Sequence, residues 1–195
     1  MLTFYHAPLS RSGRVLWLLH ELDIPFEIVR CDIPRQDGSG ARDPRNPHPD
    51  GKVPALEHDG AFITETAAIM LYLTDLFPDR GLGPAPDGPD RGGYLTWLFW
   101  YCGVVEPVYL AEVLGVADHP AAQATFRDRD AIAARLIPAL EGRDWLLGDR
   151  FSAADILLSS PYLYFPDATP DHPAVHAWIE RCTQRPGYLA AQAAD

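Results

Sequence analysis

Apolar residues follow two different spacings in the first part of the chain. Residues 2–5 and 25–30 form short apolar runs, and residues 10–22 between them place their apolar side chains at helical intervals. This pattern predicts a strand, a helix and a second strand. The segment from Arg30 to Val53 is rich in Pro, Gly, Asp and Arg, and it predicts a loop with at most one short helix.

A third apolar segment turns back on itself at residues 59–60. Pro54 begins this segment, and a proline is tolerated at the first residue of a strand because no ladder bond is lost there. The Asp-Gly pair at 59–60 favours a tight hairpin. Glu65 and Thr66 then open a run whose apolar residues recur at helical spacing as far as Leu76. The sequence therefore predicts a β-hairpin followed by a helix.

The pattern changes once, at a stretch in which proline and glycine are too frequent for a helix or a strand. We place a linker there, at residues 79–87, between an α/β domain at 1–78 and an all-helical domain at 88–195. Helical spacing in the second domain covers residues 91–114, 121–140, 153–165 and 174–181, with a short piece after Pro186. The predicted fold class is α+β, because a small α/β sheet is followed by helices alone.

Two local features shape the predicted helical domain. Ser152 and Asp155 stand three residues apart at the start of a helix and form a capping box, with Phe151 as a staple residue. Pro107 falls inside the first long helix, where its ring would collide with the carbonyl group of Gly103, four residues earlier. We therefore expect that helix to bend near Gly103.

Composition and charge restrict the possible partners. The chain has 195 residues, of which 47% are hydrophobic, and a formal net charge of -11. Nucleic acids and anionic membranes are bound through basic patches, so neither partner is expected. No apolar stretch reaches the ~20 residues that span a bilayer, and no signal-peptide pattern precedes the first strand. We therefore expect a cytoplasmic protein.

The three cysteines, Cys31, Cys102 and Cys182, are widely separated in the sequence. They form no C-x-x-C pair and no Cys/His spacing typical of a metal site, so no bound metal is expected. We interpret them as buried thiols in a reducing compartment.

The segment around Val53-Pro54 carries the candidate binding chemistry. If this peptide bond is cis, the main-chain groups of Val53 face outward and can receive another peptide. The helix that opens at Glu65 and Thr66 offers free amides to a carboxylate, and Glu65 can pair with an ammonium group. Lys52, the single lysine of the chain, stands beside Val53. These features predict a pocket for a small zwitterionic peptide.

Three stretches of the chain resemble the cytosolic glutathione transferases. The string GKVPALEHDGAFITETAAIMLYL is similar to the family's glutathione-binding signature, and TFYHAPLSRSGRVLWLLHELDIPFEIV to its first strand, active-site turn and first helix. WLLGDRFSAADILL is similar to the folding motif of its helical domain. The resemblance implies a thioredoxin-like first domain, a homodimer, and glutathione as co-substrate without a metal or redox cofactor. It also implies glutathione contacts from Lys52, Val53, Pro54, Glu65 and Thr66.

The catalytic group must make the thiol of glutathione nucleophilic. A free cysteine thiol has a pKa of ~8.5, so a hydroxyl donor and a positive field are needed to form thiolate at neutral pH. Ser10 follows the first strand near the start of a helix, where it can donate to the sulfur while the helix dipole assists. It lies four residues before Arg14, a spacing that resembles that of the activating serine in serine-type members of the family. The resemblance is to bacterial members with this type of active-site turn. The alternatives are Tyr5, which occupies the place of the hydroxyl in tyrosine-type members, and Ser12; Ser10 could also serve only as a helix cap.

In the family, the first part of the long helix of the second domain lines the pocket for the electrophile. The resemblance therefore implies an electrophile pocket formed by Trp97, Trp100, Tyr101 and Val104. The other interpretation of the same aromatic stripe is a hydrophobic core.

The leading hypothesis is a glutathione S-transferase that activates the glutathione thiolate for attack on a small hydrophobic electrophile. One alternative is a glutathione-dependent peroxidase or disulfide reductase that uses the same thiolate, and another is a non-catalytic transferase-like module for protein contacts. Residues 9–11 read Leu-Ser-Arg, whereas the maleylacetoacetate isomerase subgroup carries Ser-Ser-Cys and omega-type reductases carry a cysteine at this turn. The sequence of the turn argues against both of these specialised activities.

Overall fold

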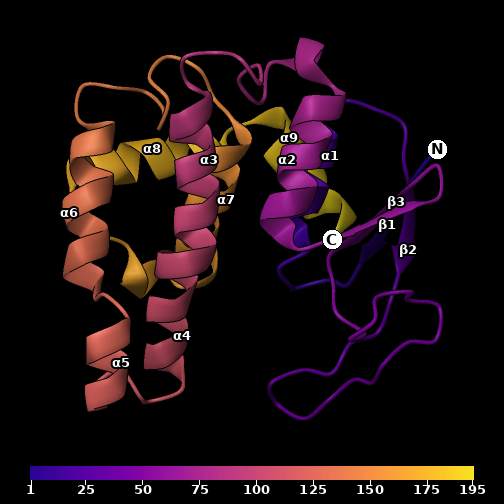
Figure 1. Ribbon diagram of the computed structural model, residues 1–195, viewed down its shortest axis with the longest axis horizontal. Helices are drawn as coiled ribbons and strands as arrows, with labels where there is room; N and C mark the ends of the chain where they lie inside the picture. Colours follow the sequence, from indigo (N-terminus) through magenta and orange to yellow (C-terminus); the bar gives the residue numbers. More distant parts are fainter. The chain divides into compact units, whose positions relative to one another are not determined.

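The computed structural model describes residues 1–195 and resolves the chain into two units (Figure 1). The first unit comprises residues 1–82 and 184–195, and the helical unit comprises residues 83–183. The sequence analysis assigned residues 184–195 to the helical domain. In the structure these residues group with the first unit, because the last helix packs against the first one.

The first unit contains a four-stranded mixed sheet in the order β2-β1-β3-β4. Its strands are β1 (Leu2–His6), β2 (Glu27–Arg30), β3 (Ala55–His58) and β4 (Ala61–Thr64). β1 and β2 are parallel and are joined through α1 (Gly13–Leu22), whereas β3 and β4 form the expected antiparallel hairpin. α2 (Thr66–Leu76) follows β4, and the short helical turn η1 (Pro78–Arg80) follows α2. This arrangement confirms the predicted thioredoxin-like α/β domain.

Side chains of β1 alternate between the two faces of the sheet. Phe4 and His6 are fully buried and their rings are in contact, with centroids 5.7 Å apart. Tyr5, between them, belongs to a separate cluster with Cys31 and Ala55. Because successive side chains of a strand point to opposite faces, His6 and Tyr5 serve different environments although they are neighbours in sequence.

The last helix, α9 (Pro186–Ala194), is fixed to α1 by close backbone approach and by polar contacts. A Cβ atom at Gly187 would lie 2.5 Å from Cγ and 2.8 Å from the backbone nitrogen of Glu21, so only glycine fits at this position. Arg185 donates hydrogen bonds of 3.0 and 2.7 Å to the two carboxylate oxygens of Glu21. The rings of Trp17 and Tyr188 complete the contact at 4.9 Å between centroids.

The helical unit is built around one helix that is buried almost throughout. Residues 153–162 of this helix, α7 (Ala153–Tyr164), are all buried. The other helical segments are α3 (Arg91–Trp100), η2 (Tyr101–Val105), α4 (Glu106–Val113), α5 (Pro120–Thr125), α6 (Arg129–Leu140), η3 (Pro166–Ala168) and α8 (Pro173–Thr183). α3 and α8 both contact α7, and α6 contacts α8 (Figure 1). No strand of the sheet belongs to this unit, which confirms the all-helical prediction.

Two predicted helices are interrupted in the structure. The long helix expected at 91–114 widens into a π-helical turn at η2, just before Pro107, in the region where the sequence predicts a bend. A wider turn accommodates the carbonyl groups that the proline ring and its missing N–H leave without partners. The single helix expected at 121–140 is wrong. It is two helices, α5 and α6, because Phe126 leaves helical geometry and the side chain of Asp128 caps α6 by accepting from the backbone N–H of Ala131 at 2.8 Å.

The capping box at the start of α7 is confirmed. The carboxylate of Asp155 accepts the backbone N–H of Ser152 at 2.9 Å and the Ser152 hydroxyl at 3.1 Å. Its other oxygen accepts the backbone N–H of Leu146 and the indole N–H of Trp178, each at 2.9 Å. This one side chain therefore joins α7, α8 and the segment before α7.

The cysteines are free thiols, but they are not all buried as the sequence analysis expected. Cys31 and Cys182 are buried, whereas Cys102 is exposed because it lies on the outer side of η2. None of the helices combines the length and the apolar composition that a bilayer-spanning helix requires.

Candidate functional site

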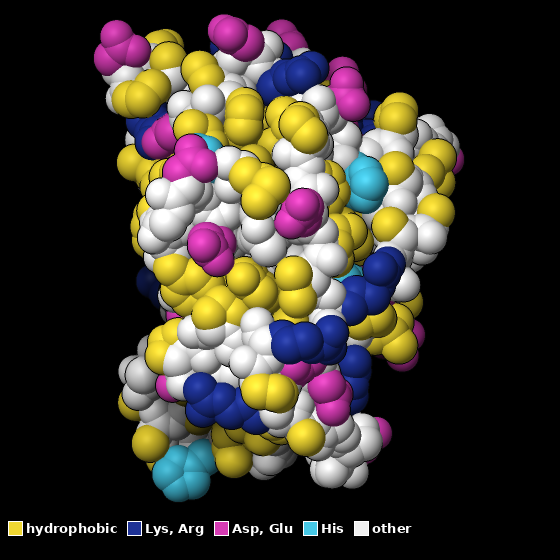
Figure 2. Space-filling model, turned by 90° about the vertical axis from the view of Figure 1, so that its right-hand side faces the viewer, with side chains coloured by type: hydrophobic (Ala, Val, Ile, Leu, Met, Phe, Trp, Pro, Cys, Tyr) yellow, Lys and Arg dark blue, Asp and Glu magenta, His cyan; other side chains and the backbone are white.

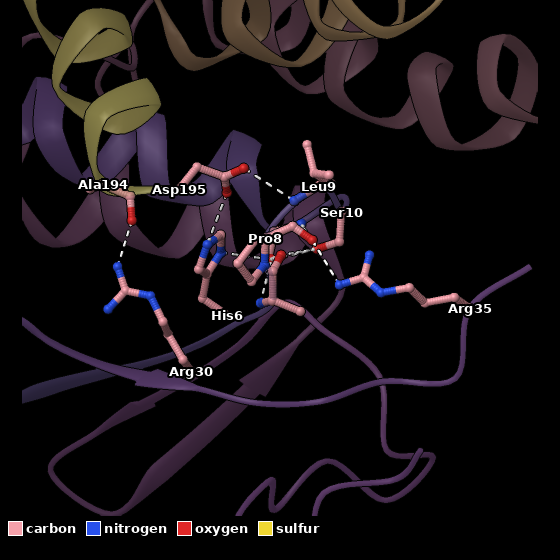
Figure 3. A network of polar contacts seen from close by, with 10 residues as sticks. His6, Pro8, Leu9, Ser10, Arg30, Arg35, Ala194 and Asp195 are labelled. Carbon is pink, nitrogen blue, oxygen red and sulfur yellow. Dashed lines mark hydrogen bonds and ion pairs between the residues drawn. The ribbon is translucent and has the colours of Figure 1, made fainter. Parts of the chain in front are cut away.

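The turn between β1 and α1 holds Ser10 in a network of hydroxyl groups (Figure 3). The Ser10 hydroxyl lies 2.7 Å from the carbonyl oxygen of Ala7, to which it donates, and 2.7 Å from Oγ of Ser12. The Ser12 backbone N–H donates to Oγ of Ser10 at 3.2 Å. Ser10 is half-buried and Ser12 is fully buried, so Ser10 is the hydroxyl of the pair that a ligand can reach.

Backbone geometry and an arginine fix the shape of this turn. Leu9 has a φ of 52°, in the left-handed region, and its side chain is 76% exposed. The Arg35 guanidinium donates to the carbonyl oxygen of Pro8 at 3.1 Å, from the loop that follows β2 (Figure 3). α1 begins at Gly13, so Ser10 lies ahead of the helix rather than in its first turn.

Tyr5, the alternative thiol-activating residue, is committed to a different partner. Its hydroxyl donates to Oε2 of Glu57 on β3 at 3.2 Å, and its side chain is only 9% exposed. Burial, followed by the hydrogen bond and the charge of Glu57, raises the pKa of Tyr5. The Tyr5 hydroxyl is therefore buried and already donates to Glu57, whereas the Ser10 hydroxyl is half-buried.

The strand register brings three candidate segments to one end of the sheet. Tyr5, Ala55 and Thr64 lie side by side on β1, β3 and β4. Beyond this row, β1 runs into the turn of Ser10, β3 is preceded by Val53 and Pro54, and β4 leads into Glu65. The turn, the Val53-Pro54 segment and the start of α2 therefore lie at the same end of the sheet, although they are far apart in sequence.

The loop before β3 is ordered by its own side chains. The Val53-Pro54 peptide bond is cis, Val53 is half-buried and Pro54 is buried. The side-chain amide of Asn46 donates to the carbonyl oxygen of Lys52 at 2.9 Å, which leaves the exposed lysine side chain outside the loop. Sequence reasoning missed Asn46, and nothing in its local spacing marks it.

Charges in this loop differ from those of the chain as a whole. Residues 30–54 contain five basic residues and four aspartates, although the full chain has a net charge of -11. Lys and Arg side chains gather in the lower part of the face shown in Figure 2, where this loop lies. Hydrogen bonds from Arg45 lower the pKa of Asp43, which keeps that carboxyl ionised and paired. The loop at residues 30–54 is therefore locally more favourable to an anion than the net charge of the chain suggests.

The start of α2 has an unusual backbone. Glu65 has φ 68° and ψ 121°, a region that non-glycine residues rarely occupy and that costs roughly 1–3 kcal/mol. Its side chain is exposed, and that of Thr66 is half-buried. The first N–H groups of α2 have no partner within the helix. A strained residue at a helix start is a feature that sequence reasoning could not detect, because glutamate itself gives no signal for positive φ.

The four residues predicted for an electrophile pocket lie on α3 and η2. Trp97, Trp100 and Tyr101 are buried, and Val104 is half-buried. The two indole rings meet edge to face with centroids 5.3 Å apart. The Arg135 guanidinium of α6 lies 5.2 Å from the ring centre of Trp97 and 4.8 Å from that of Trp100. Arg135 is therefore part of this aromatic cluster, and sequence spacing did not reveal it.

Comparison with protein families assigns the chain. Residues 4–81 match the model of the glutathione S-transferase N-terminal domain, and residues 98–186 match that of the C-terminal domain. The chain belongs to the glutathione S-transferase family. The two matches cover the first unit and the helical unit in the order that the sequence analysis expected, so both the family and the fold class are confirmed.

Individual members of the glutathione S-transferase family resemble the chain over nearly its whole length. Glutathione S-transferase F6 of Arabidopsis thaliana is 29% identical over 94% of both chains. The disulfide-bond oxidoreductase YfcG of Escherichia coli strain K12 is 26% identical over 100% of this chain and 98% of its own. A sphingomonad glutathione S-transferase, solved in complex with glutathione, is 30% identical with a TM-score of 0.78 over 98% of each chain. The chain is thus similar both to proteins named glutathione S-transferases and to one named a disulfide-bond oxidoreductase.

Proposed function

We propose that the chain binds glutathione at the end of the sheet where Tyr5, Ala55 and Thr64 lie side by side. There it activates the thiol of glutathione for attack on a small hydrophobic electrophile. The observation that carries this proposal is that the Ser10 turn, Val53 and the start of α2 meet at that end of the sheet. The chain that brings them together belongs to the glutathione S-transferase family. The sphingomonad relative that was solved with glutathione supports the choice of ligand.

We assign the peptide backbone, the γ-glutamyl carboxylate and the ammonium group of glutathione to groups at this end of the sheet. The backbone of Val53 pairs with the peptide backbone of the ligand, beside Pro54 and Lys52. The free N–H groups at the start of α2 and the Thr66 hydroxyl bind its γ-glutamyl carboxylate, and Glu65 pairs with its ammonium group. The strain at Glu65 supports this assignment, because strained backbone at a surface position is typical of ligand sites.

Ser10 is proposed to stabilise the thiolate. When glutathione binds, its hydroxyl turns from the carbonyl oxygen of Ala7 towards the sulfur and donates a charge-assisted hydrogen bond. The adjacent start of α1 adds a positive potential. Trp97, Trp100, Tyr101 and Val104 are proposed to contact the electrophile, and Arg135 to hold the two tryptophans in place. A homodimer in the cytoplasm remains part of the proposal.

A glutathione-dependent disulfide reductase is the second candidate. It is favoured by the 26% identity to the disulfide-bond oxidoreductase YfcG. The same thiolate would attack a disulfide sulfur in place of a carbon electrophile, forming a mixed disulfide and releasing the other sulfur as a thiolate. The binding residues and Ser10 serve both reactions, so the two candidates differ in the second substrate.

Calorimetry with glutathione, followed by assays with electrophiles, hydroperoxides and disulfides, tests this proposal. Binding of glutathione with turnover of aromatic or alkyl electrophiles is the expected result. Turnover of disulfides or hydroperoxides alone would select the second candidate. Absence of glutathione binding would refute both and leave a non-catalytic module. Light scattering tests the dimer in the same preparation, and a monomer at micromolar concentration would refute it.

A further inference from the structure

A buried histidine, His6, and the carboxylate of Asp195 adjoin the turn that carries Ser10 (Figure 3). His6 is fully buried, and its Nδ1 lies 2.8 Å from Oγ of Ser12. Its Nε2 lies 3.0 Å from Oδ1 of Asp195, the residue that follows α9. The other oxygen of Asp195 accepts the backbone N–H of Leu9 at 3.1 Å. The end of α9 is therefore in direct contact with the turn that carries Ser10.

The order of donors along this network follows from the carboxylate. The carboxylate oxygen 3.0 Å from Nε2 of His6 is an acceptor, so we assign the ring hydrogen to Nε2 and leave Nδ1 as an acceptor, although the Nε2 contact is not aligned as a hydrogen bond. The Ser12 hydroxyl then donates to Nδ1, while Oγ of Ser12 accepts the backbone N–H of Ala7 at 3.2 Å. Oγ of Ser10 lies 2.7 Å from Oγ of Ser12, and both hydroxyls also lie within hydrogen-bond distance of the carbonyl oxygen of Ala7. The donors run continuously from Ser10 through Ser12 to His6 once the Ser10 hydroxyl turns from Ala7 towards Ser12.

The charges around His6 suit a base that is neutral at rest. Burial lowers the pKa of His6, and the carboxylate of Asp195 opposes this effect. Arg30 on β2 is the other charged group that acts on the ring, and it disfavours the imidazolium. The Arg30 guanidinium also donates to the carbonyl oxygen of Ala194 at 2.6 Å and holds the end of α9 beside the sheet (Figure 3).

We propose that His6, paired with Asp195, accepts the thiol proton of glutathione through Ser12 and Ser10. The inference rests on the proposed function, because it requires the thiol to lie at Ser10. The S–H bond breaks with its electron pair left on sulfur, and its proton passes to Oγ of Ser10. The Ser10 proton moves to Oγ of Ser12, and the Ser12 proton moves to Nδ1 of His6.

The products are a thiolate, two neutral serines and an imidazolium paired with a carboxylate, so the net charge of the complex is unchanged. Ser12 and His6 act through Ser10 and do not touch the substrate. Their contribution is to give the proton a buried destination beside a fixed negative charge, while Ser10 donates to the new thiolate. The relay also explains why a buried serine, a buried histidine and the end of the last helix meet behind one turn.

Nitrogen NMR of histidine-labelled protein at pH 7 tests the relay directly. Glutathione should convert His6 from neutral to imidazolium, and S-methylglutathione, which has no thiol proton, should not. The signal is assigned by its loss in His6→Gln. His20 of α1, which contacts Phe26 and lies outside the network, serves as the internal control and should stay unchanged.

Ultraviolet absorbance of the thiolate, recorded on the same samples, separates the possible failures. A thiolate signal with a neutral His6 would overturn the relay and leave the activation of the thiol by Ser10 standing. Bound glutathione without a thiolate signal, or no binding at all, would overturn both proposals.

Two variants of Ser12 distinguish proton transfer from a purely structural role of this residue. Ser12→Ala should keep His6 neutral when glutathione binds and reduce the ratio of thiolate to thiol about tenfold, which corresponds to one pKa unit. Ser12→Thr keeps the hydroxyl and should restore the imidazolium. An unchanged His6 response in a folded Ser12→Ala protein would overturn the relay.

Discussion

Each of the two units contains a network of polar groups around a carboxylate, which is fully buried at Asp155 and partly exposed at Asp195. In the helical unit, Asp155 accepts four hydrogen bonds, from Leu146, Ser152 and Trp178, and every partner is buried or belongs to the backbone. All four residues of this network are buried. Burial raises the pKa of Asp155, and the hydrogen bonds oppose the effect. A closed network of this kind stabilises the fold and has no free end at which to do chemistry.

The network of the first unit is open at one end. It starts at Asp195, passes His6 and Ser12, and finishes at the half-buried hydroxyl of Ser10. Replacing a residue in the closed network should therefore affect stability, whereas replacing the outermost residue of the open network should affect chemistry.

The largest stability effect is expected for Asp155→Ala. Removing the carboxylate leaves buried N–H donors without an acceptor and deletes the capping box, which should lower the free energy of unfolding by roughly 3 kcal/mol. Chemical denaturation measures the change. Asp149→Ala, at an exposed position of the same segment, is the control and should change little. Equal stabilities of the two variants would contradict the role given to Asp155.

Gly187→Ala tests whether the open network depends on α9. The new Cβ would lie 2.5 Å from Cγ and 2.8 Å from the backbone nitrogen of Glu21, so α9 must shift. We expect a loss of about 2 kcal/mol in unfolding free energy. Gly92→Ala is the matched control, because no atom lies within 4 Å of its Cβ position in α3. That control should be neutral or slightly stabilising, since alanine favours a helix. A Gly187→Ala protein as stable as Gly92→Ala would show that α9 is not fixed to α1 in this way.

Glu65→Ala and Thr66→Ala should each weaken glutathione binding by about 1–2 kcal/mol, because each leaves a polar group of the ligand unpaired. Stability should hardly change, since both residues lie at the accessible start of α2. Isothermal calorimetry and thermal melting of the same samples separate the two effects. Wild-type affinity in both variants would remove the start of α2 from the binding site.

The smallest expected effect is the dependence of stability on pH. Burial lowers the pKa of both His6 and His20 in the folded chain. Unfolded histidine titrates near ~6.5, so the unfolded chain binds protons first as the pH falls. The free energy of unfolding should therefore decrease as the pH drops below about 6.5 towards the folded-state values. His6→Gln should flatten this slope, and an unchanged slope would mean that the pKa of His6 is the same in the folded and unfolded chain.

The sequence predicted those parts of the molecule that depend on local pattern. The hairpin at 59–60, the helix start at Glu65 and the capping box at Ser152 each carry a short-range signal, and each forms as expected. The break at Phe126 was missed because the apolar spacing continues across it, and the cap at Asp128 was overlooked.

Contacts between distant segments were not predictable from pattern. Three contacts join residues that are far apart in sequence: the contact of His6 with Asp195, the stacking of Arg135 on two tryptophan rings, and the close approach of Gly187 to Glu21. Such contacts depend on how the helices pack, and a single sequence without spatial information carries no periodic signal for them. The exposure of Cys102 on η2 likewise depends on how its helix packs.

Titration of the bound thiol, followed by its ultraviolet absorbance, is the most direct test of whether Ser10 activates glutathione. In the wild type the thiolate should form well below the pKa of a free thiol, ~8.5. Ser10→Ala should raise the pKa of the bound thiol and leave glutathione affinity nearly intact, and Tyr5→Phe should leave the titration unchanged. An unchanged titration in Ser10→Ala together with a raised pKa in Tyr5→Phe would contradict the account and transfer the role to Tyr5.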